Sequence, residues 1–333
     1  MRVKSQETYL GIDVGGTKIA VGVVSCDGSV LARTTAPTPK ASSDEFVATI
    51  VQTVRDLASG FRDLRACGIA LPASIDRDRG LVEWCPNIPA LDGLALASRL
   101  CQELGMPVVL EYDGHALAMG EHWKGSGIGS RAMLLVALGT GIGGGMILDG
   151  KIHRGANGIA GALGWMIVNP EWTKKPSLTH GNLETEASGV AYNRKLAEGH
   201  DPDEVAREIG VYLGIALSSL VSVLGLDLVV VGGGFGCFLG QPLVKTLENM
   251  IARCAAPHAS RHVQVRLSSL GVDAGIIGSA HAAAIEYHCG DDDRGRRLPP
   301  LRRNARAVQG HRGGPGLQAG PEILQAHGHE LSG

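Results

Sequence analysis

The sequence predicts an α/β protein of two domains that carry the same motif. Residues 10–24 and 134–150 each read as an apolar strand, a Gly/Thr-rich turn and a second apolar strand, followed by Asp-Gly. Short apolar strands elsewhere alternate with segments of helical periodicity, which predicts sheets covered by helices. With 333 residues, the chain is long enough for two domains and a sizeable core.

Composition and charge exclude several classes of protein. A net charge of -2 gives no general signal for binding nucleic acid or an anionic membrane. The seven cysteines are odd in number and contain no C-x-x-C pair, which favours a reducing cytoplasm over a disulfide framework. The start is short and polar, and no stretch reads as long and apolar enough to span a membrane. We therefore expect a cytoplasmic protein.

The first hairpin has the residues of a phosphate and magnesium site. Gly15 and Gly16 let backbone N–H groups approach an anion closely, because no Cβ stands in the way. Thr17 and Lys18 add a hydroxyl and a positive charge, and Asp13 is placed to hold a metal-bound water. Taken alone, the same residues also fit an ordinary hairpin with a glycine turn.

Two further glycine runs extend this hypothesis. Gly139, Thr140 and Gly141 occupy the turn of the second hairpin, so the two hairpins suggest a duplicated fold with two facing phosphate loops. Gly233 and Gly234 follow an apolar strand and are suited to approach a nucleotide base or ribose. A simple strand-to-helix turn is the alternative for this third run.

In the first half of the chain, apolar periodicity after Ser42 predicts a helix that Gly60 ends. Apolar runs and turn residues predict the other elements there: strands at 29–35, 66–71 and 107–111, a loop at 72–80 and a helix at 94–104.

In the second half, Asp201 starts a helix whose residues 205–224 are apolar nearly all round, which predicts a buried helix ended by Gly225. Loops are expected at 153–164 and 170–181, and strands at 228–231 and 263–267. Further helices are expected to begin at 183 and to span 242–254 and 275–286. From residue 289, arginines stand among Gly, Pro and His with few apolar residues, which predicts a disordered tail; a nucleic-acid or membrane arm is the alternative.

Asp113 is the candidate general base. It follows the predicted strand 107–111, and ligands of α/β sheets bind beyond the carboxyl ends of strands. An N-cap of the helix predicted at 116–122 is the alternative role for this aspartate. His115 and His122 are interpreted as surface residues.

Seven motifs, in this order and spacing, resemble the ROK family of repressors, open reading frames and sugar kinases over residues 8–286. They are DVGGTK from Asp13, LPASID from Leu71, CPNIP from Cys85, YDGHALAMGE from Tyr112, GTGIGGG from Gly139, LET from Leu183 and VGGG from Val231. The resemblance implies an actin/hexokinase-like fold of two ribonuclease-H-like domains around a cleft, at residues 1–115 and 116–288, with a tail at 289–333. It also implies that the last helix packs on the first domain.

The resemblance also implies the chemistry, an ATP- and Mg²⁺-dependent transfer of phosphate to a primary hydroxyl of a hexose-like sugar, and we expect a homodimer. Asp113 matches the family's catalytic base, Asn87 and Glu184 match sugar-hydroxyl contacts, and Ser74 is a further substrate candidate. The nucleotide positions match as well: Asp13, Gly15, Gly16 and Thr17 with Gly139, Thr140 and Gly141 at the phosphates, and Gly233 and Gly234 at the adenosine.

The sugar half departs from the family pattern. Ala162 and Trp165 stand where many members have a glutamate and a histidine, and residues 175–184 lack the cysteines of the family's structural zinc site. Tyr112 and His115 replace two usual asparagines. We therefore expect no zinc, and an acceptor that is an amino sugar or a carbocyclic analogue. Trp165 as core filling with plain glucose as acceptor, a non-catalytic sugar sensor or repressor, and a sugar-independent nucleotide hydrolase are the alternatives.

Overall fold

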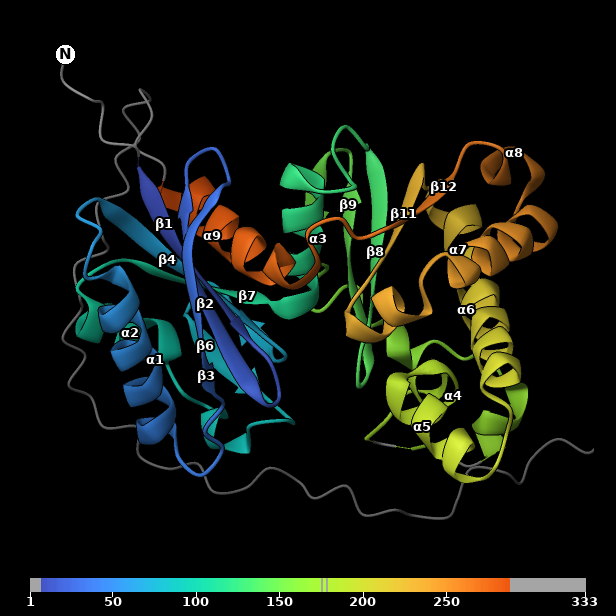
Figure 1. The fold of residues 1–333 in the computed structure, drawn as a ribbon, viewed down its shortest axis with the longest axis horizontal. Coiled ribbons are helices and arrows are strands. Elements are labelled where there is room, and N and C mark those ends of the chain that lie inside the picture. Colours follow the sequence, from blue (N-terminus) through green and yellow to red (C-terminus); the bar gives the residue numbers. More distant parts are fainter. Residues whose placement is uncertain (1–6, 175, 178, 288–333) are drawn as a thin grey trace, which may run out of the picture. The chain divides into compact units, whose positions relative to one another are not determined.

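The computed structural model of the protein describes residues 7–174, 176–177 and 179–287. The tail predicted from residue 289 lies outside these residues. The described chain contains two five-stranded mixed sheets, each with its own hydrophobic core, and helices pack against both sheets (Figure 1). The α/β fold class predicted from the sequence is therefore confirmed.

The first sheet has the strand order β3-β2-β1-β4-β7. β1 pairs antiparallel with β2 and parallel with β4, so a hairpin continues into a parallel sheet. Helices α1 and α2 contribute Phe46 and Leu100 to the core under this sheet. The elements are β1 (Thr8–Val14), β2 (Lys18–Ser25), β3 (Val30–Pro37), α1 (Ser43–Ala58), β4 (Leu64–Leu71), α2 (Leu96–Leu104) and β7 (Val108–Tyr112).

The second sheet repeats this arrangement with the order β10-β9-β8-β11-β12. β8 pairs antiparallel with β9 and parallel with β11, as β1 does with its two neighbours. The sequence repeat of the two glycine hairpins is therefore a repeat of sheet topology. The strands are β8 (Ala132–Leu138), β9 (Ile142–Leu148), β10 (Lys151–His153), β11 (Leu228–Gly232) and β12 (Gln264–Leu267).

Short strands occupy two segments that the sequence predicted as loops. β5 (Ser74–Asp76) and β6 (Leu81–Trp84) pair antiparallel within the predicted loop 72–80 and just after it. β10 lies at the start of the predicted loop 153–164 and pairs with β9. Strands of three or four residues are too short to show an alternating pattern, so periodicity does not reveal them.

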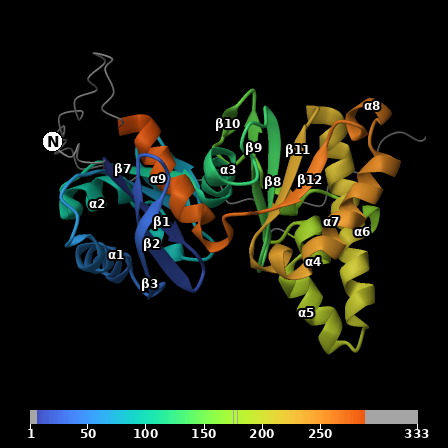
Figure 2. The same cartoon turned by 45° about the horizontal axis from the view of Figure 1, so that its top comes forward.

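Helices α3 (Asp113–Lys124) and α9 (Ala274–Tyr287) pack against one another and connect the two sheets. α9 lies on β1 and β4, where a Cβ built on Gly11 or Gly68 would overlap its backbone. α3 also lies on β9, where a Cβ on Gly114 would overlap the Gly144 carbonyl. The two views show α3 between α9 and β9 (Figure 2).

The long helix α6 (Pro202–Leu224) corrects one expectation from the sequence. By length and composition alone it is long and apolar enough to cross a membrane, and 44% of its most apolar window is buried in this fold. Its inner side, including Ile209, Leu213 and Leu217, belongs to the core of the second sheet. The predicted cap Asp201 accepts hydrogen bonds from Asp203 and Glu204, and Gly225 ends the helix with φ 60.

The remaining helices surround this second core. They are α4 (Asn182–Ala187), α5 (Gly189–Ala197), α7 (Gly234–Cys254) and α8 (Pro257–Ser260). α7 begins earlier than the predicted 242–254, because a first helical segment is joined to the second across a kink at Gly240, which has φ 58 and ψ -145.

Candidate active site

Asp113 lies at the junction of β7 and α3. Tyr112 is the N-cap of α3 and Asp113 lies in the first turn of this helix, so Asp113 is not the N-cap residue. Its Oδ1 accepts a hydrogen bond from the N–H of Gly114 at 2.7 Å. Burial, and then the negative charge of Asp13, raise the pKa of Asp113 to about 7. A carboxyl group with this pKa gains and loses its proton near neutral pH.

Asp13 lies at the end of β1, and the two aspartates are close enough to interact electrostatically. Burial raises the pKa of Asp13 to about 6, against the positive charge of Lys18. Its carboxylate packs against Gly275 in the first turn of α9, where a Cβ would overlap it. Among the described residues, no hydrogen-bond donor to this carboxylate is found, so its oxygens are available to a hydrated cation.

The first hairpin turn is open at its tip. Gly15 donates a hydrogen bond from its N–H to the Lys18 carbonyl at 2.9 Å, which closes the turn. Its carbonyl accepts a hydrogen bond from the Thr38 hydroxyl at 2.8 Å. Thr17 and Lys18 are exposed, and a Cβ on Gly16 would contact nothing within 4 Å. The structure therefore leaves room for an anion at this tip.

The second and third glycine runs meet. Gly139 and Gly141 close the second hairpin turn with a 3.0 Å hydrogen bond, and the Gly139 carbonyl accepts one from Gly189 at the start of α5. Gly233 has φ +79 and packs so tightly on the Leu138 carbonyl that a Cβ would overlap it. The exposed side chain of Thr140 and the exposed Gly234 adjoin this junction.

The predicted acceptor-side residues come from separate elements. Glu184 of α4 accepts a hydrogen bond from the N–H of Ile142 at 2.9 Å, and its carboxylate lies against Gly141. Glu184 therefore contacts the second hairpin. Burial, followed by the charges of Asp113 and Glu184, raises the pKa of Tyr112. The ring of Tyr112 thus lies within range of both carboxylates.

Asn87 and Ser74 lie on the β5–β6 side of the site. Burial raises the pKa of Cys85 to about 11, and the charge of Asp113 contributes to the rise. The segment from Cys85 to the exposed Asn87 therefore lies near the candidate base. Ser74 donates its hydroxyl to Glu83 at 2.9 Å.

Trp165 is exposed, and its surroundings differ from those of a zinc site. The side chain is 49% exposed, so it does not fill the core. Near it, the buried amide oxygen of Asn182 accepts hydrogen bonds from the N–H groups of Val168 and Asn169, both at 2.8 Å. No group of three or more His, Cys, Asp or Glu residues suited to a metal ion is found in the part of the chain that the structure describes. Lys175 lies outside that part.

The interpretation of the two histidines as surface residues is wrong. His115 is fully buried, with Nδ1 3.1 Å from Glu111 and Nε2 2.8 Å from the Ala160 carbonyl. His122 is half-buried, with Nε2 2.9 Å from the Ser130 carbonyl. The Ala160 carbonyl is 45 positions from His115 in the sequence, so no local pattern could have revealed that contact.

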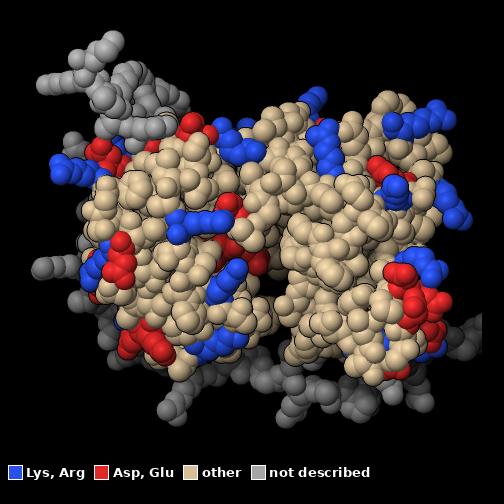
Figure 3. Space-filling model, viewed as in Figure 1, with Lys and Arg blue, Asp and Glu red and all other residues tan. Residues whose placement is uncertain are grey.

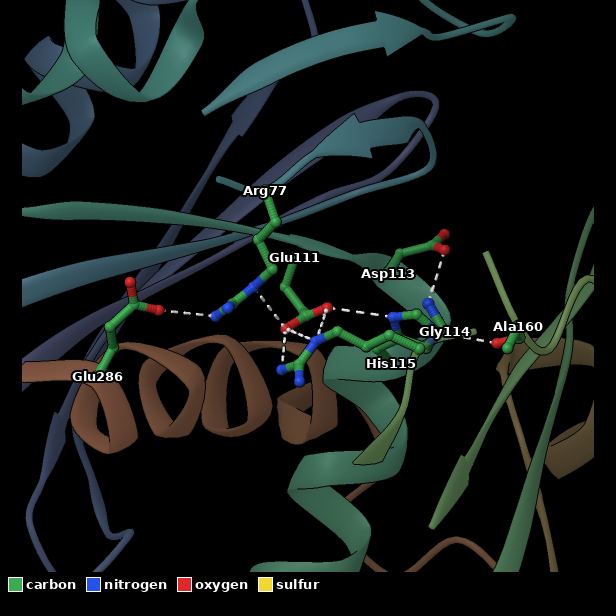
Figure 4. Close-up of polar contacts among 8 residues, drawn as sticks. Arg77, Glu111, Asp113, Gly114, His115, Ala160 and Glu286 are labelled. Carbon is green, nitrogen blue, oxygen red and sulfur yellow. Dashed lines mark hydrogen bonds and ion pairs between the residues drawn. The ribbon is translucent and has the colours of Figure 1, made fainter. Parts of the chain in front are cut away.

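A cluster of charged residues around the buried Glu111, next to Asp113, was missed by the sequence reasoning (Figure 4). Glu111 pairs with Arg154 and Arg77, and Arg77 also pairs with Glu286 of α9 at 3.0 Å. The one signal in the sequence is a glutamate within an otherwise apolar strand, where a charge requires partners.

The face seen in Figure 3 shows acidic and basic side chains interspersed over the described surface. Such a mixture accords with the net charge of -2. It gives this face no continuous basic band of the kind that tracks a phosphate backbone.

Comparisons with known proteins find relatives that match most of this chain. A model of the ROK family matches residues 9–285. A glucokinase of Halalkalibacterium halodurans is 31% identical over 82% of this chain and 94% of its own length. An N-acetyl-D-glucosamine kinase of Haemophilus influenzae is 27% identical over 82% of this chain and 97% of its own. The structure of a ROK family glucokinase from Streptomyces griseus in complex with glucose and AMPPNP covers 84% of this chain and 99% of its own, with 29% identity and a TM-score of 0.72.

Proposed function

The chain belongs to the ROK family and is a sugar kinase, and from this premise we propose that its acceptor is an amino sugar or a carbocyclic sugar analogue. The fold is the two-domain actin/hexokinase-like fold of its structural relatives. As a phosphotransferase with an alcohol group as acceptor, the protein uses ATP. The assignment of the catalytic base rests on one observation. Asp113 has a pKa raised to about 7, partly by the charge of Asp13, and the two aspartates lie at the ends of two strands of one sheet.

In the proposed mechanism, Asp113 accepts the proton of the primary hydroxyl as that oxygen attacks the γ-phosphate. General-base assistance of this kind contributes typically about 10²–10⁴-fold. The turns at 15–16 and 139–141 would bind the phosphates through the backbone N–H groups that remain free, since those of Gly15 and Gly139 close the turns themselves. Gly233 and Gly234 would contact the adenosine. Asp13 would hold Mg²⁺ through a water, and the bound ion would supply charge neutralisation at the phosphates. Asn87 and Glu184 bind sugar hydroxyls, with Ser74 as a further contact.

The acceptor preference rests on Ala162 and Trp165. Ala162 offers no side-chain hydrogen bond, and Trp165 presents an exposed ring with a single N–H donor. A pocket that hydrogen-bonds a sugar hydroxyl discriminates strongly against a molecule that lacks that hydroxyl. Ala162 and Trp165, which we call the acceptor wall, lack the glutamate and histidine of the family pattern and cannot select glucose through those two side chains. Relatives named for glucose and for N-acetylglucosamine both match the chain, so glucose itself is the alternative acceptor.

The test compares kcat/KM for glucose, aminohexoses and cyclitols by measuring ADP release. We expect at least one aminohexose or cyclitol to equal or exceed glucose. A tenfold or greater preference for glucose over every other compound would overturn the proposed specificity. ADP release that is independent of any acceptor would instead indicate a nucleotide hydrolase.

A double variant tests directly whether Ala162 and Trp165 determine the acceptor preference. Ala162→Glu with Trp165→His restores the residues that many relatives have, and we expect it to raise kcat/KM for glucose relative to the best aminohexose or cyclitol. Ile128→His is the control, because Ile128 is also an exposed apolar side chain, at 62%, and lies between α3 and β8 outside the predicted contacts. The cytoplasmic location and the absence of nucleic-acid partners remain predictions.

A further inference from the structure

The buried charge cluster beside Asp113 has no part in the proposed reaction. Its centre is Glu111 of β7, whose side chain is 2% exposed. Arg154 holds this carboxylate with Nε 3.1 Å from both oxygens and Nη2 2.6 Å from Oε2. The Nδ1 of His115 lies 3.1 Å from Oε1, and the Nε of Arg77 lies 3.3 Å from Oε2. Figure 4 shows these groups converging on one carboxylate.

The cluster is electrostatically strong. Burial alone would raise the pKa of Glu111, but hydrogen bonds from His115 and Arg154 and the charges of Arg154 and Arg77 outweigh burial and lower the pKa to about 2. The carboxylate therefore stays ionised at neutral pH. Glu111 is buried, whereas the side chains of Arg154 and Arg77 are 31% and 30% exposed, so loss of either arginine removes a counter-charge from a buried carboxylate.

Two members of the cluster hold the loop 154–162. Arg154 begins this loop, and its carbonyl accepts a hydrogen bond from the N–H of Ala160 at 3.1 Å. The Nε2 of His115 lies 2.8 Å from the Ala160 carbonyl. The two ring nitrogens of His115 therefore contact the Glu111 carboxylate on one side and the Ala160 carbonyl on the other. The loop is thus tied near both of its ends to residues at the β7–α3 junction.

Within the loop, backbone hydrogen bonds join the N–H of Ala160 to Arg154 and the N–H of Ala162 to Ile159. Gly155, Gly158 and Gly161 have φ of 70, 70 and 107, values that side chains rarely adopt. Glycines permit this path but contribute no side-chain packing, and they increase the freedom of the chain. The position of the loop therefore depends on its contacts with its surroundings, which are the two anchors in the cluster and the packing of Gly161 on the Gly144 carbonyl of β9.

The same anchors flank the candidate base. Glu111 and His115 lie two residues before and two residues after Asp113, and the loop that they hold ends at Ala162 of the acceptor wall. We propose that Glu111, His115 and Arg154 are positioning residues. They hold the loop that ends at Ala162 of the acceptor wall in a fixed position relative to Asp113. This inference rests on the proposed function, because it concerns the acceptor of the same site. A displacement of about 1 Å in a reacting group can cost about 10²-fold in rate.

The first experiment is steady-state kinetics of Arg154→Gln with glucose and glucosamine. We expect KM for the better acceptor to rise tenfold or more while KM for ATP stays within twofold of the parent. Arg154→Lys keeps the charge but loses the forked geometry, and its KM is expected to lie between those of parent and Arg154→Gln. Arg131→Gln is the matched control: it breaks a 3.1 Å ion pair with Asp149 whose side chains are 82% and 88% exposed. The control should behave as the parent does.

Hydrogen–deuterium exchange separates positioning from mere stability. In Arg154→Gln, amides of residues 155–162 should exchange at least tenfold faster while those of β8 and β11 are unchanged. Faster exchange with an acceptor KM within twofold of the parent would overturn the positioning role. Unchanged exchange would overturn the anchoring itself. A parent enzyme that releases no ADP with any acceptor would refute the proposed function, and the exchange result would still decide whether the cluster anchors the loop.

A double variant tests whether the cluster acts as a unit. Glu111→Gln combined with Arg154→Gln should raise the acceptor KM no further than the more damaging single change, because both remove the same interaction. Effects that multiply would show two independent contributions and contradict the proposal.

Discussion

At the residue scale, the central feature is a pair of aspartates whose environments raise both pKa values. Asp113 reaches about 7 and Asp13 about 6, with burial as the main cause in each case. Because the two groups interact, the apparent pKa values belong to the pair. A nearby cation would favour the charged form of each carboxylate, in accord with the proposed Mg²⁺ at Asp13.

Asp113→Asn should leave nucleotide binding near normal and reduce kcat by about 10²–10⁴-fold, since the amide cannot accept the hydroxyl proton. The measurement is ADP release at saturating acceptor, with ATP binding followed by calorimetry. Turnover within threefold of the parent would contradict the assignment of the base.

The pH profile follows from the same pKa. Below pH 7 the carboxyl of Asp113 is increasingly protonated and cannot act as a base, so kcat/KM should fall about tenfold per pH unit as the pH decreases, and level off above pH 7. Rates measured between pH 5 and 8.5 at constant ionic strength test this. A profile that is flat over this range would show that no group with this pKa limits the reaction.

At the element scale, glycines set how closely α3 and α9 approach each other and the sheets. A Cβ built on Gly278 would overlap the Ala116 carbonyl, and one on Gly120 would overlap the Ala274 carbonyl. This close approach places the start of α9 against Asp13 and the start of α3 at Asp113. The crossing of the two helices therefore contributes to the geometry of the site.

Gly278→Ala should destabilise the protein by about 1–3 kcal/mol, the usual cost of forcing extra volume into a packed interior. The free energy of unfolding, measured with urea, tests this. Gly60→Ala is the control, because a Cβ there would contact nothing within 4 Å, and its effect should be small. Equal stabilities of the two variants would indicate that the crossing tolerates a methyl group.

The region where the family resemblance would place a zinc site is held here by protein hydrogen bonds. The amide oxygen of Asn182 binds two successive backbone N–H groups, at Val168 and Asn169. We expect purified protein to contain no stoichiometric zinc, and EDTA to leave its melting temperature unchanged. One tightly bound zinc per chain by elemental analysis would contradict this.

At the scale of the whole molecule, the outer face of α6 is the surface that we expect to form the interface of the predicted homodimer. Val211, Ile215 and Val223 are 42%, 39% and 79% exposed, and the helix carries no charged residue after Glu208. A two-fold interface uses the same patch on both subunits, which suits a continuous uncharged strip. The homodimer stays a prediction.

Ile215→Glu should shift the protein toward monomer, because two buried like charges would face each other across the two-fold axis. Light scattering after size-exclusion chromatography measures the mass. Val272→Glu, at an equally apolar position that is 68% exposed on another element, is the control and should keep the parent mass. A parent that is itself monomeric would refute the homodimer, and a dimeric Ile215→Glu variant would place the interface elsewhere.

The sequence by itself determined the features that neighbouring residues produce, which are hairpin turns and helix ends. The duplicated hairpins predicted the repeated topology of β1–β2 and β8–β9, and Asp201 and Gly225 predicted the ends of α6, because turns and caps are made by neighbouring residues. The resemblance to one family placed Asp113 and the glycine runs in the site, and these residue roles await the variants above.

Only the tertiary structure decided how residues far apart in the chain meet. Glu111, Arg154 and His115 form one cluster although 43 residues separate Glu111 from Arg154, and neither the strand pattern nor the loop pattern contains that contact. The raised pKa values of Asp13 and Asp113 likewise arise from burial in the folded chain, and the charge of Asp13 adds to the rise at Asp113. Packing and electrostatics act through space, so a contact between distant segments has no local pattern to reveal it.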